Sequence, residues 1–279
     1  MVIPPIIQSL PYVAWMLLVA LSFGSFVFVV VTRQLTDATT GYLRFTAATA
    51  ALIGLLALFA DPGSPTVPLT DLAIHGSTPA AATLRAEALV GFVILAVVYV
   101  VVVRMRGVAL VVGSLAIGAA IGTLAVAALG WAPTEADAVP LVVQLAMLSV
   151  VTGGSLAAIV LGHWYLVTPG ISERPLVLQA RLLLASLIVQ ALLFVTWTTL
   201  GGGPGQTPFS AFTTGPVVLV ALRAIVTIAF PIVLTWMAWR TALTRSMESA
   251  TGLLYINFAA VMAGTIGAAA LYVSSGILV

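Results

Sequence analysis

Long runs of apolar residues, interrupted by short polar breaks, make up most of the chain. An apolar run of about 20 residues crosses the hydrocarbon core of a membrane as a helix, and the breaks contain residues that end helices, such as Pro62 and Pro65. The expected spans lie near residues 11–32, 40–60, 86–104, 108–131, 139–166, 175–200, 215–239 and 249–274. The pattern predicts an all-α, polytopic membrane bundle of eight transmembrane helices that forms one domain over residues 1–279. The runs are continuous, which excludes the alternating segments of a membrane β-barrel.

The arginines set the expected orientation, because positively charged loops stay in the cytoplasm. Most of them lie in or beside the breaks after the first, third, fifth and seventh runs: Arg33, Arg44, Arg104, Arg106, Arg174, Arg181, Arg240 and Arg245. The other two are Arg85, expected in an outer loop, and Arg223, inside a span. We therefore predict that both termini face outward.

Composition narrows the class of protein. Hydrophobic residues make up 62% of the chain and charged residues only 6%, against about 25% charged in soluble domains. This excludes a soluble enzyme, a disordered tail and a nucleic-acid-binding protein. The basic residues are all arginine, and Ala, Val and Gly are abundant, which is typical of a GC-rich bacterial genome. We expect a multi-pass protein of the bacterial cytoplasmic (inner) membrane.

One group of polar and aromatic residues is expected at the cytoplasmic interface. It consists of His163, Trp164, Tyr165, Arg44, Arg181 and Tyr255. If these side chains converge, their donors and aromatic walls suit a quinone headgroup or a lipid phosphate. The alternative is that they only anchor helices, because aromatic residues and arginines are common at membrane interfaces.

A second group lies within the spans. Arg223 is seven residues beyond Pro216, about 10 Å into its helix at 1.5 Å per residue, and no carboxylate is expected at that depth. A buried guanidinium there suits an anionic or carbonyl oxygen of a ligand. Gln179 and Gln190 belong to a polar stripe of the sixth span, which predicts either interhelical hydrogen bonds or a ligand groove.

Cofactor chemistry is limited by the histidines. His75 is expected outside and His163 near the inner surface, on opposite sides of about 30 Å of hydrocarbon, so a bis-histidine haem is not expected. The sequence contains no cysteine and no recognisable metal-binding or catalytic motif. We expect no covalently bound cofactor, with quinone as the candidate ligand, and activity only within a quinone-linked oxidoreductase complex.

The turn after the second span reads Ala60-Asp61-Pro62-Gly63-Ser64-Pro65. With the eight helices and outward termini, its Gly-Ser-Pro stretch resembles the NrfD/DmsC type of quinol-interacting membrane anchor. The histidine that this family often has in the stretch is absent, and no family site residue is carried over. The resemblance implies a membrane subunit that contacts quinol.

The short loops indicate a protein that works with partner subunits or on lipid-soluble molecules. Our main hypothesis is a membrane subunit of a respiratory or photosynthetic electron-transfer complex that contacts quinone, quinol or lipid, with other membrane or peripheral subunits as partners. The alternatives are a small-anion transporter and an accessory or assembly subunit without a ligand. Nucleic acid is not an expected partner.

Overall fold

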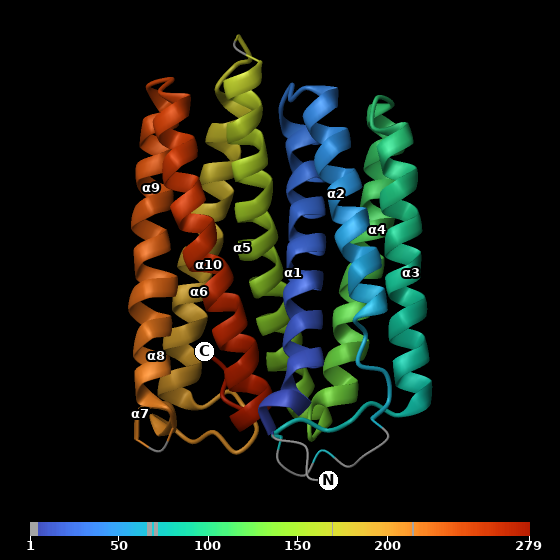
Figure 1. Cartoon of the computed structure of the whole chain (residues 1–279), viewed down its shortest axis with the longest axis vertical. Coiled ribbons are helices and arrows are strands. Elements are labelled where there is room, and N and C mark those ends of the chain that lie inside the picture. The colour runs from blue at the N-terminus through green and yellow to red at the C-terminus, as the bar shows by residue number, and fades with distance from the viewer. Residues whose placement is uncertain (1–4, 66–68, 70–71, 169, 214) are drawn as a thin grey trace.

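The computed structural model describes residues 5–65, 69, 72–168, 170–213 and 215–279, and these residues form helices with no strand. Eight helical segments of this part of the chain are long and apolar enough to cross a membrane, as predicted (Figure 1). They are α1 (Pro5–Leu35), α2 (Thr40–Phe59), α3 (Pro79–Val102), α4 (Arg106–Trp131), α5 (Glu135–Val167), α6 (Arg174–Leu200), the joined α8 (Val217–Ala224), η1 (Ile225–Ala229) and α9 (Phe230–Leu243), and α10 (Met247–Ser275). The short α7 (Ser210–Thr213) precedes α8.

The start of α3 differs most from the sequence expectation. The helix begins at Pro79, where Thr78 caps it by accepting a hydrogen bond from the Ala81 amide at 3.2 Å. Arg85 therefore lies in the second turn of α3 and is 0% exposed. Its placement in an outer loop is wrong, because a charged residue in a helix end can be buried when the fold supplies a counter-charge.

The start of α1 and the end of α10 lie at the same end of the bundle (Figure 1). We call this the terminal end; it also holds the connections near residues 61–65, 72–78, 132–134 and 201–209. The opposite end, with the connections near residues 36–39, 103–105 and 244–246, is called the turn end. The arginine distribution remains the basis for expecting the turn end in the cytoplasm.

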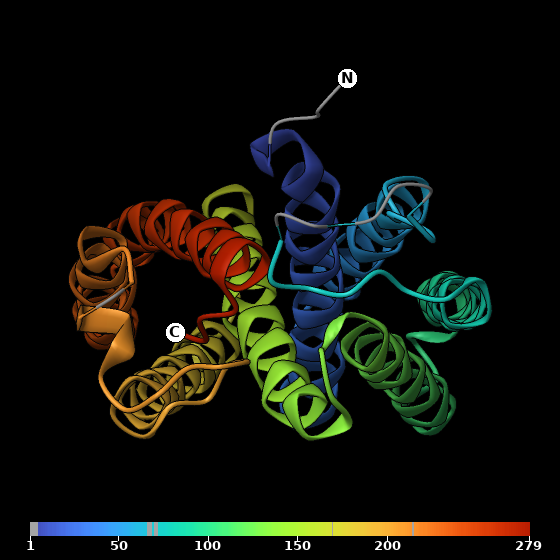
Figure 2. The ribbon, with the colours of Figure 1, turned by 90° about the horizontal axis from the view of Figure 1, so that it is seen from below.

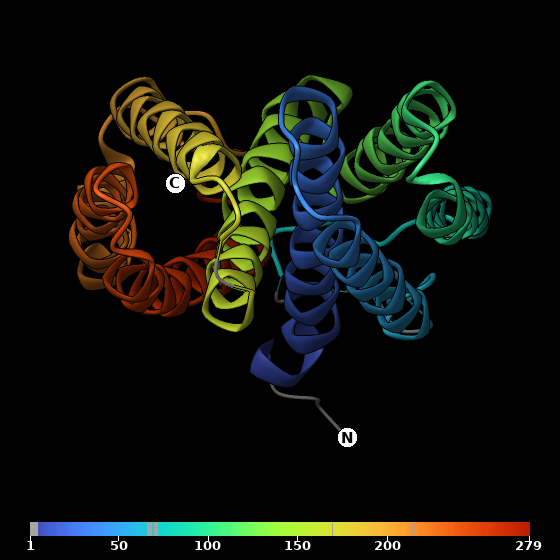
Figure 3. The same ribbon diagram turned by 90° about the horizontal axis from the view of Figure 1, so that it is seen from above.

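The spans form two groups of four. Seen along the bundle, α1 and α5 lie side by side in the centre (Figures 2 and 3). Helices α2, α3 and α4 extend to one side of this pair, and α6, the α8–η1–α9 segment and α10 extend to the other. Each half of the chain thus contributes one central helix and three outer helices, in the same order.

The two central helices cross at Gly24 of α1 and Gly153 of α5. A Cβ atom on Gly24 would overlap the Ser149 carbonyl, and one on Gly153 would overlap the Ser25 amide nitrogen. Glycine is needed at both positions because only its missing side chain lets helix backbones approach this closely. The crossing joins the two halves.

Candidate functional site

The predicted interface group is divided among four places in the structure. His163, Trp164 and Tyr255 line one groove of about 380 Å³ between α2, α5 and α10 at the turn end. The remaining walls are apolar: Phe45, Ile159, Val160 and Val167. His163 and Tyr255 are exposed at the surface of the groove, and Trp164 lies against Gly41 of α2.

The two arginines of the group do not line this groove. Arg44 donates from Nε to the Val100 carbonyl near the end of α3, at 3.2 Å, so it satisfies a helix C-terminus. The Arg181 guanidinium lies over the Trp239 ring of α9, 5.1 Å from the ring centroid. Their contacts are with α3 in one half and α9 in the other.

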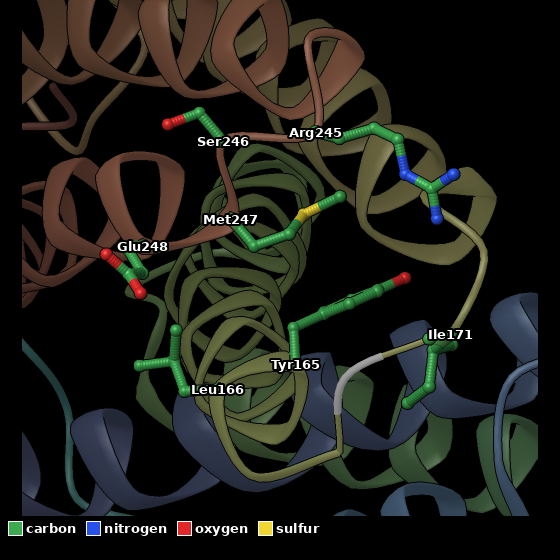
Figure 4. A pocket seen from close by; sticks show the side chains of 8 residues that line it. Tyr165, Leu166, Ile171, Arg245, Ser246, Met247 and Glu248 are labelled. Carbon is green, nitrogen blue, oxygen red and sulfur yellow. The ribbon is translucent and has the colours of Figure 1, made fainter.

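Tyr165 belongs to a separate hollow of about 400 Å³ at the turn end (Figure 4). Its hydroxyl donates to the Ser172 carbonyl at 2.6 Å. Arg245 and Glu248 line the same hollow and lie to either side of Tyr165 in Figure 4. Arg245 Nε lies 3.6 Å from a carboxylate oxygen of Glu173. Arg245 and Glu173 are well exposed, so this is a solvated surface pair of small energetic weight.

The glutamines of the sixth span are both buried. Gln179 donates to the Thr32 hydroxyl at 2.8 Å and to the Tyr42 hydroxyl at 2.6 Å, so it joins α6 to α1 and α2. This is the interhelical hydrogen bonding that the polar stripe predicts. The amide oxygen of Gln190 has no donor among the described residues.

The buried residue with the strongest unmet bonding capacity is Arg223. It is 4% exposed and lines a pocket of about 230 Å³ between α8, η1 and α10. Its Nη1 donates to the Thr227 hydroxyl at 3.2 Å. Nε and Nη2 have no acceptor in the part of the chain that the structure describes, although buried donors in proteins are almost always bonded.

The other walls of this pocket offer almost no polar groups. Besides Arg223 and Thr227 they are Leu219, Leu222, Val226, Ala263, Gly264, Gly267 and Leu271. Leu219 and Leu222 are 53% and 49% exposed on the outer surface of the bundle. The pocket therefore opens toward the surface that lipid would cover.

A break in helical geometry lies directly beside Arg223. Pro231 has no N–H to donate, and the preceding turn, η1, is a π-helix in which the Phe230 amide bonds the Ile225 carbonyl. Such wide turns are rare in proteins, and many of those that are known lie at functional sites. The Thr227 hydroxyl lies within η1 and donates to the Arg223 carbonyl at 2.9 Å.

The depth of the guanidinium follows from helix geometry. Thr227 is ten residues into the segment that begins at Val217, and Gly264 is eleven residues before the end of α10 at Ser275. At 1.5 Å per residue both lie about 15 Å from the terminal end. A Cβ on Gly264 would be 2.5 Å from Arg223 Nη1, so the guanidinium packs at this level, well inside spanning segments of 27 and 29 residues.

Arg85 in the first half is fully paired. Its Nε donates to Asp61 Oδ2 at 2.8 Å, Nη2 donates to Asp61 Oδ1, and Nη1 donates to the Ser77 hydroxyl at 2.7 Å. The guanidinium carbon lies 5.6 Å from the Trp15 ring centroid and 5.1 Å from that of Trp131. Sequence reasoning missed this cluster, although Asp61 beside a helix end and Trp131 at the same end were both visible signals.

The chain matches no family model, no curated protein and no solved structure. The candidate site accordingly rests on the geometry of Arg223 and its pocket.

Proposed function

We propose that this integral membrane protein binds a lipid-soluble molecule whose head carries an oxygen acceptor, and that Arg223 holds this head. The observation that carries the proposal is the Nε–Nη2 edge of the Arg223 guanidinium, which has no acceptor within the described chain. Leaving a buried donor unsatisfied costs about 1–3 kcal/mol, and more for a charged group. A ligand oxygen at this edge offsets that cost.

The surroundings of Arg223 indicate the rest of the ligand. The pocket walls are apolar apart from Thr227, and the exposed Leu219 and Leu222 lie on the lipid-facing side. An apolar tail fits such walls, and the molecule would enter sideways from the bilayer. A water-soluble substrate would have no polar path along these residues.

Quinone or quinol is one ligand of this class, because its ring oxygens accept hydrogen bonds and its tail is apolar. In that use the chain is the membrane subunit of a respiratory or photosynthetic electron-transfer complex. Other membrane or peripheral subunits would carry the electrons, since the connections between the described spans are too short to hold a redox domain. The groove with His163, Trp164 and Tyr255 is a second proposed contact for a quinone or lipid headgroup.

Small-anion transport is the second candidate function. It is favoured by the charge distribution, because residues 174–247 contain five arginines and no aspartate or glutamate. At the terminal end of this half, however, residues 276–279 are buried, and Figure 2 shows the C-terminus lying among its helices. The Leu278 amide donates to Gln206 Oε1 at 3.1 Å, and Gln144 Nε2 donates to the Val279 carbonyl at 2.9 Å. An anion path through this end would require these bonds to break.

Photolabelling in lipid nanodiscs tests the proposal. A photoreactive quinone analogue and a photoreactive fatty acid are each crosslinked to the purified protein, and the labelled peptides are identified by mass spectrometry. We expect label from at least one probe on α8, η1 or α10, lost in Arg223→Met and kept in the control Arg181→Met. Label that is unchanged in Arg223→Met, or found only on other helices, would contradict the proposal.

A further inference from the structure

The two halves of the chain carry an arginine at the same position of their third span. Arg85 is the seventh residue of α3 and Arg223 the seventh residue of α8. The local sequences also agree: Leu84-Arg85-Ala86 is followed by Phe92, and Leu222-Arg223-Ala224 by Phe230, each seven residues beyond the arginine. The first half therefore provides a buried arginine at the same helix position with which the bonds of Arg223 can be compared.

The bonds of the two guanidinium groups correspond atom by atom on one edge and differ on the other. In both, Nη1 donates to a hydroxyl, of Ser77 for Arg85 and of Thr227 for Arg223. In Arg85, Nε and Nη2 bind the two carboxylate oxygens of Asp61. In Arg223, the same two nitrogens have no acceptor anywhere in the described residues.

The second half also has a glycine at the position where the first half has Asp61, the carboxylate that pairs with Arg85. Asp61 is the second residue after the end of α2 at Phe59, and Gly202 is the second residue after the end of α6 at Leu200. The Arg223 side chain instead reaches deeper, toward Thr227 and Gly264 of α10. Arg223 therefore has a hydroxyl partner from its own helical segment and no carboxylate partner among the described residues.

From this comparison we propose that the Nε–Nη2 edge of Arg223 binds the carboxylate of a single-chain amphiphile, such as a fatty acid, that enters from the bilayer. This rests on the proposed function and specifies the ligand's head. A carboxylate forms two parallel charge-assisted bonds with this edge of a guanidinium. A neutral quinone carbonyl supplies one oxygen and leaves the buried charge uncompensated. The apolar pocket of about 230 Å³ fits a carboxylate and the start of its chain better than a bulky phospholipid head.

A pair of ligands that differ in the charge of the head, and otherwise only by one methyl group, provides the test. Nitroxide-labelled stearic acid and its methyl ester are added to the purified protein in nanodiscs, and the immobilised fraction is measured by electron paramagnetic resonance. We expect the acid to be immobilised and the ester not. Unlabelled fatty acid should displace the spin label, and unlabelled methyl ester should not.

Two variants of Thr227 with side chains of the same shape test whether a carboxylate supplied by the protein can replace that of the ligand. Thr227→Asp puts a carboxylate where Arg223 Nη1 now meets a hydroxyl, whereas Thr227→Asn has the same size and no charge. We expect Thr227→Asp to weaken binding of the acid roughly 10- to 100-fold, the range expected for lost charge-assisted bonds, with a much smaller effect of Thr227→Asn. Arg223→Met should abolish the immobilised fraction, and its thermal unfolding curve shows whether it is folded.

The outcomes separate this inference from the proposed function. Equal immobilisation of acid and ester, or equal binding of the acid by Thr227→Asp and Thr227→Asn, would overturn the carboxylate assignment. If a quinone analogue binds in an Arg223-dependent way and the acid does not, the inference fails and the proposed function stands. If neither ligand binds in an Arg223-dependent way, both fail.

Discussion

At the scale of single residues, two equivalent arginines have opposite surroundings. Arg85 is fully buried but every polar edge of its guanidinium is bonded, mainly by Asp61, and two tryptophan rings cover it. Arg223 is almost as buried, and one edge has no partner among the residues described. The first arrangement joins α3 to the chain around Asp61 and Ser77, and the second is the site that we propose for a ligand.

Removing the partner of Arg85 tests its structural role. Asp61→Asn leaves a buried guanidinium without its counter-charge, and we expect the free energy of unfolding to fall by about 3–5 kcal/mol. Thermal unfolding in mild detergent measures this, with the exposed Asp37→Asn as control. The double variant Asp61→Asn with Arg85→Met should recover part of the loss. An Asp61→Asn variant as stable as Asp37→Asn would contradict this role.

The residues of the sequence-predicted interface group show why a site of this kind is hard to predict. The position of each residue along its predicted helix placed the whole group near one end of the bundle. This was enough to predict that His163, Trp164 and Tyr255 lie close together, and they do line one groove. The direction of a long arginine side chain depends on which helix packs beside it. Arg44 and Arg181 turn to α3 and α9, neighbours that the sequence did not identify.

At the scale of helices, glycines decide which surfaces meet. Gly24 and Gly153 allow α1 and α5 to cross in contact, and Gly264 leaves room on α10 for the Arg223 guanidinium. Glycine-rich stretches could be recognised in the sequence. The sequence does not show which of these glycines has a close neighbour, because that depends on the helix pairs that the fold brings together.

The central crossing gives a stability prediction. In Gly153→Ala the new methyl group would meet the backbone of α1 at Gly24 and Ser25, which cannot yield as a side chain can. We expect a lower thermal unfolding temperature or loss of folded protein, as overpacking of a core typically costs 1–3 kcal/mol or more. Gly118→Ala in α4 is the matched control, because no atom of the described residues lies within 4 Å of its new methyl group.

The α10 face of the pocket gives a binding prediction. Gly264→Ala places a methyl group 2.5 Å from Arg223 Nη1 and should displace the guanidinium and weaken ligand binding about tenfold or more, the factor that corresponds to 1.4 kcal/mol. Gly267→Ala changes the same pocket, but its methyl group meets nothing within 4 Å in the described chain. Binding is measured with the spin-labelled fatty acid. If both variants bind it equally well, the position of the Arg223 guanidinium does not determine ligand binding.

At the scale of the whole molecule, eight spans in two groups of four bring the start of α1 and the end of α10 to one end of the bundle. The number of spans could be predicted because an apolar run of sufficient length needs no knowledge of its neighbours. The division into halves around α1 and α5 could not, since the matching segments around Arg85 and Arg223 are short and differ elsewhere. The lack of an acceptor at the Nε–Nη2 edge of Arg223 became visible only with its three-dimensional surroundings.

Orientation in the membrane is a separate prediction from the arginine distribution. Reporter fusions at residues 36, 106, 172 and 244 should read cytoplasmic, and fusions at residues 70, 135 and 207 should read external. Because successive spans run in opposite directions between the two ends, a consistent reversal of all fusions would keep the topology and overturn the orientation. Two or more readings reversed in isolation would contradict the assigned connections.

The central claim is that a lipid-soluble ligand supplies the missing acceptor of Arg223. An electron cryo-microscopy map of the protein in native-lipid nanodiscs, with an antibody fragment bound to give it size, tests this most directly. We predict non-protein density in the pocket between α8, η1 and α10, with its head within hydrogen-bond distance of Nε and Nη2 of Arg223 and its tail directed toward Leu219 and Leu222. A map in which these two nitrogens bond to protein atoms, and the pocket is filled by side chains, would contradict the account.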